Sequence, residues 1–253
     1  IRAITESFSG GMEAAFGEMI ANGETDRLKK SYFRYKTLIT AVSFGLFSCA
    51  GILIVPFVRL YTKGVTDADY IQTAFSFVLM LAEAVNCIVP PCSSLPVAAN
   101  RLKQTRWGAY GEAIINIAVS CILIKWSPLL GVAVGTLAAT LFRGIFYMTY
   151  SSKKLLHIPT RTVIVKFIAA VTCLCIVTAA GRYITLPLEI ENYFQWILCG
   201  AAVFAAACLP IMLIAGLRIR RLGIDKKENG GDKLPENIYS ELEDEQRAYT
   251  DCK

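Results

Sequence analysis

Ionisable and amide side chains recur at helical spacing inside otherwise apolar segments of this chain. One row runs along segment 104–120 and consists of Gln104, Gly108, Glu112, Asn116 and Ser120. Positions four residues apart lie above one another on a helix, so these side chains share one face. A charge in hydrocarbon costs at least about 2.5 kcal/mol on insertion scales, and such groups therefore face a bundle interior or a wet cavity.

Two further segments carry polar rows with steps of three, four or seven residues. One row is Gln72, Ser76, Glu83, Asn86 and Pro90, and the other is Thr136, Thr140, Arg143 and Tyr147. Three consecutive helices with one polar face each are expected to line a common cavity. The residues expected to line it and to contact a substrate are Glu83, Asn86, Glu112, Asn116, Thr136 and Arg143, with Glu13 and Gln72 as further candidates.

A packing role stays open as an alternative for these polar residues. Asn, Ser and Thr side chains hydrogen-bond neighbouring helices in membranes, and a long arginine such as Arg143 can extend to the membrane surface. Glu83, Glu112 and Arg143 are harder to explain by packing, because ionisable groups are the most costly in hydrocarbon. We therefore give these three the strongest functional interpretation.

Cysteine and histidine usage limits the chemistry that the chain can perform. Of the nine cysteines, most lie in apolar runs, which is typical of packing and not of a disulfide framework. The sequence contains no Cys-x-x-Cys pair, and His157 alone cannot form a histidine-based zinc site or a catalytic triad. We expect no metal, no cofactor and no catalytic residue, and the chain is not predicted to be an enzyme.

The segments that carry these rows predict an all-α, polytopic transmembrane bundle. The chain of 253 residues is 55% apolar and 18% charged, with a mean hydropathy of +0.48, well above soluble domains. Apolar runs of about 20 residues match the hydrocarbon thickness of a bilayer. They occur at 38–58, 71–89, 110–124, 129–150, 163–180 and 194–217. Most prolines, including Pro56, Pro90 and Pro91, are expected at the ends of these spans.

Lysine and arginine alternate between the connecting segments as the positive-inside rule requires. Basic residues are dense before the first span, between spans two and three, between spans four and five, and after span six. This pattern predicts that both ends of the six-span unit, including the C-terminus, are cytoplasmic. The net charge of +6 then reflects contact with anionic headgroups of the lipid bilayer, and no nucleic acid partner is expected.

The same reading divides the chain into three parts. Residues 1–35 are expected to hold a truncated helix followed by a basic cytoplasmic loop. Residues 36–217 are expected to form a six-helix transmembrane lobe, in which spans two to four hold the polar interior and spans five and six face lipid. Residues 218–253 have the composition of a disordered, polar cytoplasmic tail.

Several motifs in order carry a family resemblance. They are GMEAAFGEMIANG at 11–23, LYTKGVTDADY at 60–70, EAIINIAVS at 112–120, and GVAVGT at 131–136 followed by Arg143. With these motifs, residues 1 to about 217 resemble the C-terminal half of bacterial polysaccharide flippases. Those proteins form the Wzx-type branch of the multidrug/oligosaccharidyl-lipid/polysaccharide exporter superfamily.

The resemblance implies a transporter with two pseudo-symmetric lobes in the bacterial cytoplasmic membrane, of which the N-terminal lobe is missing here. It implies alternating-access transport of an undecaprenyl-diphosphate-linked oligosaccharide for O-antigen, capsule or exopolysaccharide synthesis. Polysaccharide-assembly enzymes are implied as further partners. In this reading Arg143 attracts the diphosphate head or pairs with an acidic neighbour, while Glu83 and Glu112 serve cation coupling or contact sugars.

Other functions stay open. A peptidoglycan lipid-precursor flippase and a cation-coupled multidrug exporter belong to the same superfamily. A membrane polysaccharide polymerase or ligase is disfavoured, since the expected outer loops at 59–70, 125–128 and 181–193 are too short to carry a catalytic platform. A purely structural membrane subunit is a further alternative.

Overall fold

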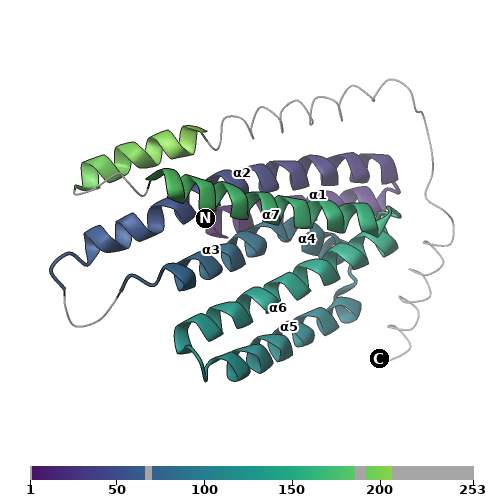
Figure 1. Ribbon diagram of the computed structural model, residues 1–253. Helices are drawn as coiled ribbons and strands as arrows, with labels where there is room; N and C mark the ends of the chain where they lie inside the picture. Colours follow the sequence, from purple (N-terminus) through teal and green to yellow (C-terminus); the bar gives the residue numbers. More distant parts are fainter. Residues whose placement is uncertain (1, 66–69, 186–191, 207–253) are drawn as a thin grey trace.

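Helices make up all the regular structure of the computed structural model, which describes residues 2–65, 70–185 and 192–206 (Figure 1). The elements are α1 (Arg2–Ala21), α2 (Thr25–Tyr61), α3 (Thr73–Ile88), α4 (Pro90–Ala98), α5 (Leu102–Leu123), α6 (Pro128–Tyr150), the π-helix η1 (Ser151–Leu155) and α7 (Thr160–Thr185). A short apolar helix, Tyr193–Ala206, follows. The predicted all-α helical bundle is therefore confirmed in the described residues.

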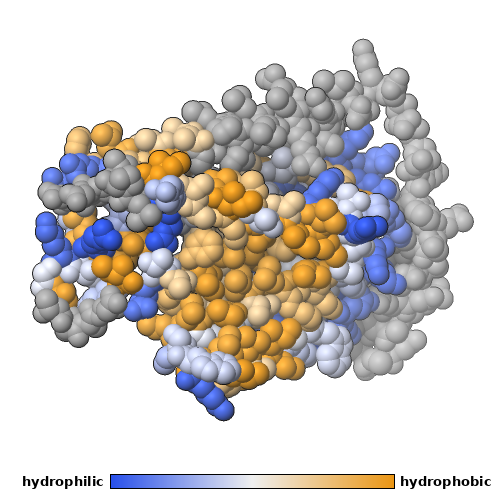
Figure 2. Space-filling model, viewed as in Figure 1, coloured by the Kyte–Doolittle hydropathy of each residue, from blue (hydrophilic) through white to orange (hydrophobic). Residues whose placement is uncertain are grey.

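Four helices in the described residues are long and apolar enough to cross a membrane. They are Thr25–Tyr61, Thr73–Ala98, Pro128–Leu155 and Thr160–Thr185. Each exceeds the roughly 20 residues that a helix needs to span the hydrocarbon core. Figure 2 shows a broad apolar surface across the middle of the bundle, with hydrophilic residues gathered toward its two ends. The chain is a multi-pass membrane protein.

Two of the six predicted spans differ from these four. The third predicted span forms α5, but its polar row keeps it out of the group that is apolar enough to cross a membrane by composition alone. The described part of the sixth is the short helix Tyr193–Ala206. Residues 207–217 of that span and the predicted tail at 218–253 lie outside the described residues.

The expectation that Pro90 and Pro91 end the second span is wrong. Helix α3 is followed directly by α4, and Thr73–Ala98 forms one candidate span. Val89 keeps a right-handed helical conformation and its N–H donates to Val85 O at 3.2 Å. Both prolines occupy the first turn of α4, where a helix lacks partners for N–H groups, so their missing donors do no harm.

The basic segment before the first span is helical, not a loop. Helix α2 begins at Thr25 and carries Asp26 in its first turn, where a carboxylate favours the positive end of the helix dipole. Leu28, Tyr32 and Tyr35 follow at helical spacing and are all buried. Burial of this apolar face stabilises the additional helical turns that precede the predicted span.

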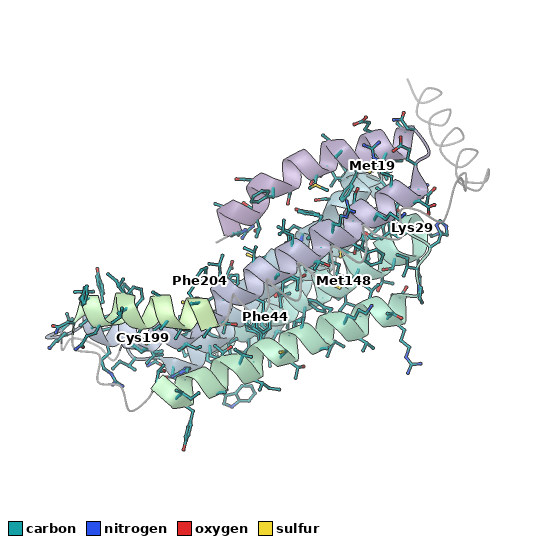
Figure 3. All side chains as sticks on the ribbon, turned by 90° about the horizontal axis from the view of Figure 1, so that it is seen from above. Met19, Lys29, Phe44, Met148, Cys199 and Phe204 are labelled. Carbon is teal, nitrogen blue, oxygen red and sulfur yellow. The ribbon has the colours of Figure 1, made fainter. Side chains whose placement is uncertain are left out.

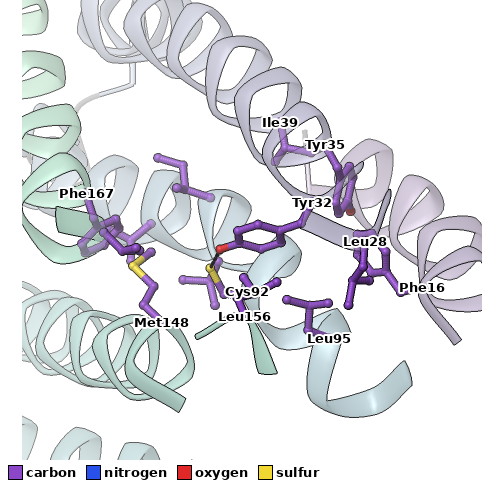
Figure 4. Packing of buried hydrophobic residues seen from close by; sticks show 14 residues of the cluster. Phe16, Leu28, Tyr32, Tyr35, Ile39, Cys92, Leu95, Met148, Leu156 and Phe167 are labelled. Carbon is purple, nitrogen blue, oxygen red and sulfur yellow. Dashed lines mark hydrogen bonds between the residues drawn. The ribbon is translucent and has the colours of Figure 1, made fainter. Parts of the chain in front are cut away.

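A core cluster binds this basic end of the bundle together (Figure 4). Tyr32 lies in its middle, and its hydroxyl is 3.1 Å from Cys92 Sγ of α4. Phe16 of α1 is fully buried in the same cluster, as is Met148 of α6. Helix α1 therefore packs as part of the bundle.

The helices differ in how deeply they are buried. Helix α2 has the most buried apolar window of the four candidate spans, and α7 has the least. In the view of Figure 3, α2 extends through the bundle from Lys29 at one end toward Cys199 near the other. Helix α5 contacts α6 and, to a small extent, α4, and it lies at the margin in Figure 1. Spans five and six were expected at the lipid-facing edge of the bundle. Helix α7, the fifth span, is the least buried of the four candidate spans, and α5 also lies at the edge.

Candidate functional site

Four of the eight predicted site residues are joined through α6, which contacts both α3 and α5. Arg143 of α6 approaches both carboxylate oxygens of Glu112 on α5, with Nη1 at 3.2 Å from Oε1 and 3.3 Å from Oε2. Its Nη2 donates to Asn86 Oδ1 of α3 at 2.6 Å. Asn86 Nδ2 in turn donates to Glu83 Oε1 at 3.5 Å. The four side chains form one polar chain across three helices, which we call the Arg143 network.

The amide of Asn86 is oriented consistently in this network. Its oxygen accepts from the positively charged guanidinium, and its nitrogen donates to the negatively charged Glu83 carboxylate. Glu83 and Asn86 are three residues apart on α3 and so share a helix face. A single amide thus joins the ion pair of α5 and α6 to the second carboxylate.

Arg143 retains capacity for a further anionic partner. Its side chain is 27% exposed and that of Glu112 is 24% exposed. Its Nε is buried and makes no hydrogen bond within the described residues. A guanidinium presents five donors in a planar fork, and Glu112 and Asn86 engage only some of them. The arrangement can hold an anionic group beside the ion pair.

The antiparallel packing of α5 on α6 brings Glu112 and Arg143 together. Gly108 and Gly111 of α5 lie where an added Cβ would be 2.5 Å from the rings of Phe146 and Phe142, respectively. Near the turn, an added Cβ at Gly135 would be 2.0 Å from Ser120 Oγ. The three glycines permit close approach of the two helices. This register then places residue 112 opposite residue 143.

Most polar side chains of the α5 row form hydrogen bonds within the α5–α6 hairpin. Gln104 Oε1 accepts a hydrogen bond from Tyr150 of α6 at 2.5 Å. Asn116 Oδ1 accepts one from Ser120 at 3.2 Å, beside Gly135. The row faces α6 because its small and polar side chains allow the closest helix contact. The packing alternative therefore describes Gln104, Asn116 and Ser120.

Three predicted residues lie outside the Arg143 network for different reasons. Thr136 Oγ1 donates to Val132 O of its own helix at 3.0 Å, which satisfies its hydroxyl locally. Glu13 of α1 accepts a hydrogen bond from Ser94 Oγ of α4 at 3.0 Å and so joins these two helices. Gln72 stands immediately before α3, at the far end of that helix from Asn86.

A cavity of about 740 Å³ lies between α2 and α3, with one contribution from the start of α6. Its lining residues are Phe47, Ala50, Ile54, Val58, Tyr61, Thr62, Val65, Tyr70, Gln72, Phe75, Ser76, Leu79, Met80, Glu83 and Leu129. Two predicted residues, Gln72 and Glu83, are among them. This cavity lies mainly between α2 and α3, and the prediction that α3, α5 and α6 line a common cavity stays a prediction.

Sequence reasoning missed the aromatic side chains of the cavity and one partner in the α5–α6 interface. Phe47 and Phe75 gave no signal, because an apolar residue in an apolar span has no distinguishing spacing. Tyr150 had a detectable signal, since it follows Arg143 by seven residues and so extends the polar row of α6.

The described residues contain no cluster of side chains that could bind a metal ion. Groups of three or more His, Cys, Asp or Glu side chains in suitable positions do not occur there. The seven described cysteines form no disulfide with one another, and Cys87 and Cys92 are fully buried. These two thiols belong to the apolar packing of α3 and α4.

No protein-family model, curated protein or solved structure matches this chain.

Proposed function

We propose that this chain is one lobe of a transporter that moves a lipid-linked oligosaccharide across the bacterial cytoplasmic membrane for polysaccharide synthesis. The observation that carries the proposal is Arg143, a partly exposed cation held between three helices of a membrane bundle. An intramembrane ionisable residue of this kind marks a substrate or ion pathway in most membrane proteins.

The chemistry of the proposed substrate fits this cation. An undecaprenyl-diphosphate-linked sugar carries its negative charge at the diphosphate, which must pass the apolar core. Arginine matches phosphate oxygens with paired N–H donors, and the Arg143 side chain is 27% exposed. Glu112 and Asn86 hold the guanidinium in a defined orientation before an anion arrives.

The network also offers a means of release. A diphosphate that approaches Arg143 competes with the Glu112 carboxylate for the same donors, so each favours a different arrangement of α5 against α6. Transporters built from two lobes expose such a site alternately to each side of the membrane. Exchange between Glu112 and the substrate at Arg143 supplies the difference in contacts that alternating states require.

Complementation of a strain that lacks the full-length gene tests this proposal. Arg143→Gln removes the cation, and we expect surface polysaccharide to fall more than about tenfold, which corresponds to 1.4 kcal/mol of lost interaction. Arg143→Lys keeps the charge but loses the planar fork, so we expect an intermediate level. Arg106→Gln removes an exposed arginine from α5 and serves as the matched control at wild-type level.

Protein abundance in the membrane is measured in parallel for every variant. Normal polysaccharide export by an abundant Arg143→Gln protein would overturn the proposal. Accumulation of lipid-linked oligosaccharide on the cytoplasmic side of the Arg143→Gln strain would support it directly.

A further inference from the structure

A short helix, Tyr193–Ala206, lies along the second half of α2 and contacts it through one narrow stripe (Figure 3). Trp196, Cys199, Gly200 and Val203 are partly buried, whereas the other residues of this helix are exposed. Their steps of three and four residues place them on one helix face. An element that is held through so few buried contacts separates from its neighbour at low cost in free energy.

Trp196 contacts α2 on both sides of Pro56. Its Nε1 donates to Leu53 O at 3.2 Å, before the proline. Its ring centre lies 5.2 Å from that of Phe57, after the proline. Phe57 in turn stacks on Tyr61, with 5.9 Å between the ring centres. One side chain of another helix therefore joins the two segments of α2 that meet at Pro56.

Pro56 makes this part of α2 a point at which the helix can bend. Proline has no N–H, so Ile52 O lacks the donor that an ordinary residue would supply four positions later, and the ring crowds that carbonyl. Sharp bends in helices occur mostly at such positions. In membranes, neighbouring helices supply partners for the loosened backbone groups. The Trp196 indole does so at Leu53, the residue next to Ile52.

A second contact, one turn further along the short helix, keeps the two helices close. Cys49 Sγ of α2 donates to Gly200 O at 3.7 Å. An added Cβ at Gly200 would lie 3.2 Å from Leu53 Cδ1, so only a residue without a side chain allows this approach freely. The two helices run antiparallel, because Trp196 meets the later part of α2 and Gly200 the earlier part.

The same stretch of α2 forms one wall of the cavity of about 740 Å³. Ile54 and Val58 line this cavity from either side of Pro56, and Thr62 lines it from the end of the helix. Leu129, at the start of α6, also lines it. A bend at Pro56 moves Val58 and Thr62 relative to Ile54, so it changes the width of the cavity at this end.

We propose that Trp196 holds a hinge in α2 at Pro56, and that its release lets the last turns of α2 bend and changes the width of the cavity. In hinge motions a few residues absorb the change in backbone angles, while the segments on each side stay rigid. The part of α2 beyond Pro56 is about 8 Å long at the helical rise. A change of about 20° in the bend therefore moves its end by about 3 Å. The proposal does not depend on the transport function proposed above.

The distance across the cavity in the purified full-length protein tests this hinge. Spin labels on Lys63→Cys and Lys125→Cys, in a cysteine-free background with Cys49→Ser, mark the ends of α2 and α5. Pulsed electron paramagnetic resonance measures the distance between them. Trp196→Phe keeps an aromatic ring but removes the N–H donor, and we expect a second distance population shifted by about 3 Å. Trp196→Ala, which also removes the ring contact with Phe57, should enlarge that population.

Three further variants separate a hinge from general packing. Pro56→Ala restores the backbone donor, so Trp196→Phe should leave the distance unaltered in that background. Gly200→Val keeps Trp196 but pushes the short helix away from Leu53, and we expect it to reproduce the shifted population. Trp107→Phe makes the matched change at a tryptophan that is 65% exposed on α5, and the distance should stay as in the parent protein.

The proposal is overturned by any of three results: an unchanged distance distribution in folded Trp196→Phe and Gly200→Val proteins, an equal shift for Trp196→Phe with and without Pro56, or an equal shift for Trp107→Phe. The second result would show that Trp196 supports the packing of α2 as a whole. Trp196→Phe and Gly200→Val disturb the same contact independently, so the question is decided even if one of them does not fold.

Discussion

Arg143 is positioned by contacts with two partners and not by one short ion pair. Its contacts with Glu112 are 3.2 and 3.3 Å long, whereas its contact with Asn86 is 2.6 Å. About a quarter of each charged side chain remains exposed. Such a pair lies between surface ion pairs, which contribute little, and fully buried ones, in which loss of one member is severe.

A double-mutant cycle measures how strongly these two residues interact. Arg143→Gln leaves Glu112 in apolar surroundings without its counter-charge, and we expect a loss of about 2 kcal/mol in stability. Glu112→Gln should destabilise similarly. The double variant should lose less than the two single changes together, with a coupling of about 1 kcal/mol. Unfolding of the purified protein in detergent provides the measurement.

Lys166→Gln, on the exposed face of α7, is the control and should leave stability within error. Additive effects of the two network substitutions would show that the ion pair does not contribute and would contradict the prediction.

The identity of the important residues could be predicted from sequence, but their partners could not. The ionisable residues Glu83, Glu112 and Arg143 are expensive in a membrane, and all three occur in the network. Which of them pair depends on the register of α5 against α6. That register is set by the turn after Leu123 and by glycines facing aromatic rings, and side-chain spacing along a single helix carries no information about it.

At the scale of elements, small residues determine how closely helices approach. Gly135 faces Ser120 across the α5–α6 contact, whereas Gly11 on α1 has nothing within 4 Å of the position where a Cβ would stand. The same substitution at these two helical glycines therefore has opposite expected consequences.

Gly135→Ala places a methyl group against Ser120 and should destabilise the protein by about 1–3 kcal/mol. Gly11→Ala meets open space and should stabilise α1 by about 0.5–1 kcal/mol, because alanine loses less backbone freedom on folding. Thermal unfolding of both purified variants checks the two signs. A stabilising Gly135→Ala would show that α5 and α6 pack less closely than described.

Element prediction succeeded where periodicity was strong and failed where proline appeared to end a helix. The apolar runs identified α2, α3, α6 and α7 as candidate spans. The join at Val89 was missed because a proline pair either ends a helix or begins the next one in line, and sequence does not distinguish these outcomes. The basic turns of α2 were missed because charges on one face concealed Leu28, Tyr32 and Tyr35 on the other.

At the scale of the whole molecule, hydrophilic residues gather toward the two ends of an apolar bundle (Figure 2). The end that holds Lys29 also holds the cluster around Tyr32. By the positive-inside rule we expect this basic end to be cytoplasmic. The C-terminal ends of α2 and α5 then lie on the opposite, outer side of the membrane.

Single cysteines introduced into a cysteine-free protein test this topology in intact cells. Lys63→Cys and Lys125→Cys should react with a membrane-impermeant maleimide from outside, since they follow α2 and α5. Lys103→Cys and Lys154→Cys should react only after the cells are opened. Labelling of residue 125 only in opened cells would show that α5 does not cross the membrane.

Helix α5 has few contacts outside its hairpin with α6, and this has a consequence for biosynthesis. Glu112 and Asn116 make α5 a poor substrate for the insertion machinery when it emerges alone. Once α6 follows, Arg143 neutralises Glu112 and the two helices can partition together. A nascent chain that stops at residue 127 should leave α5 largely uninserted, whereas one that stops at residue 155 should insert both, as a glycosylation reporter would detect. Commitment of α5 to the membrane thus waits for residues translated after it.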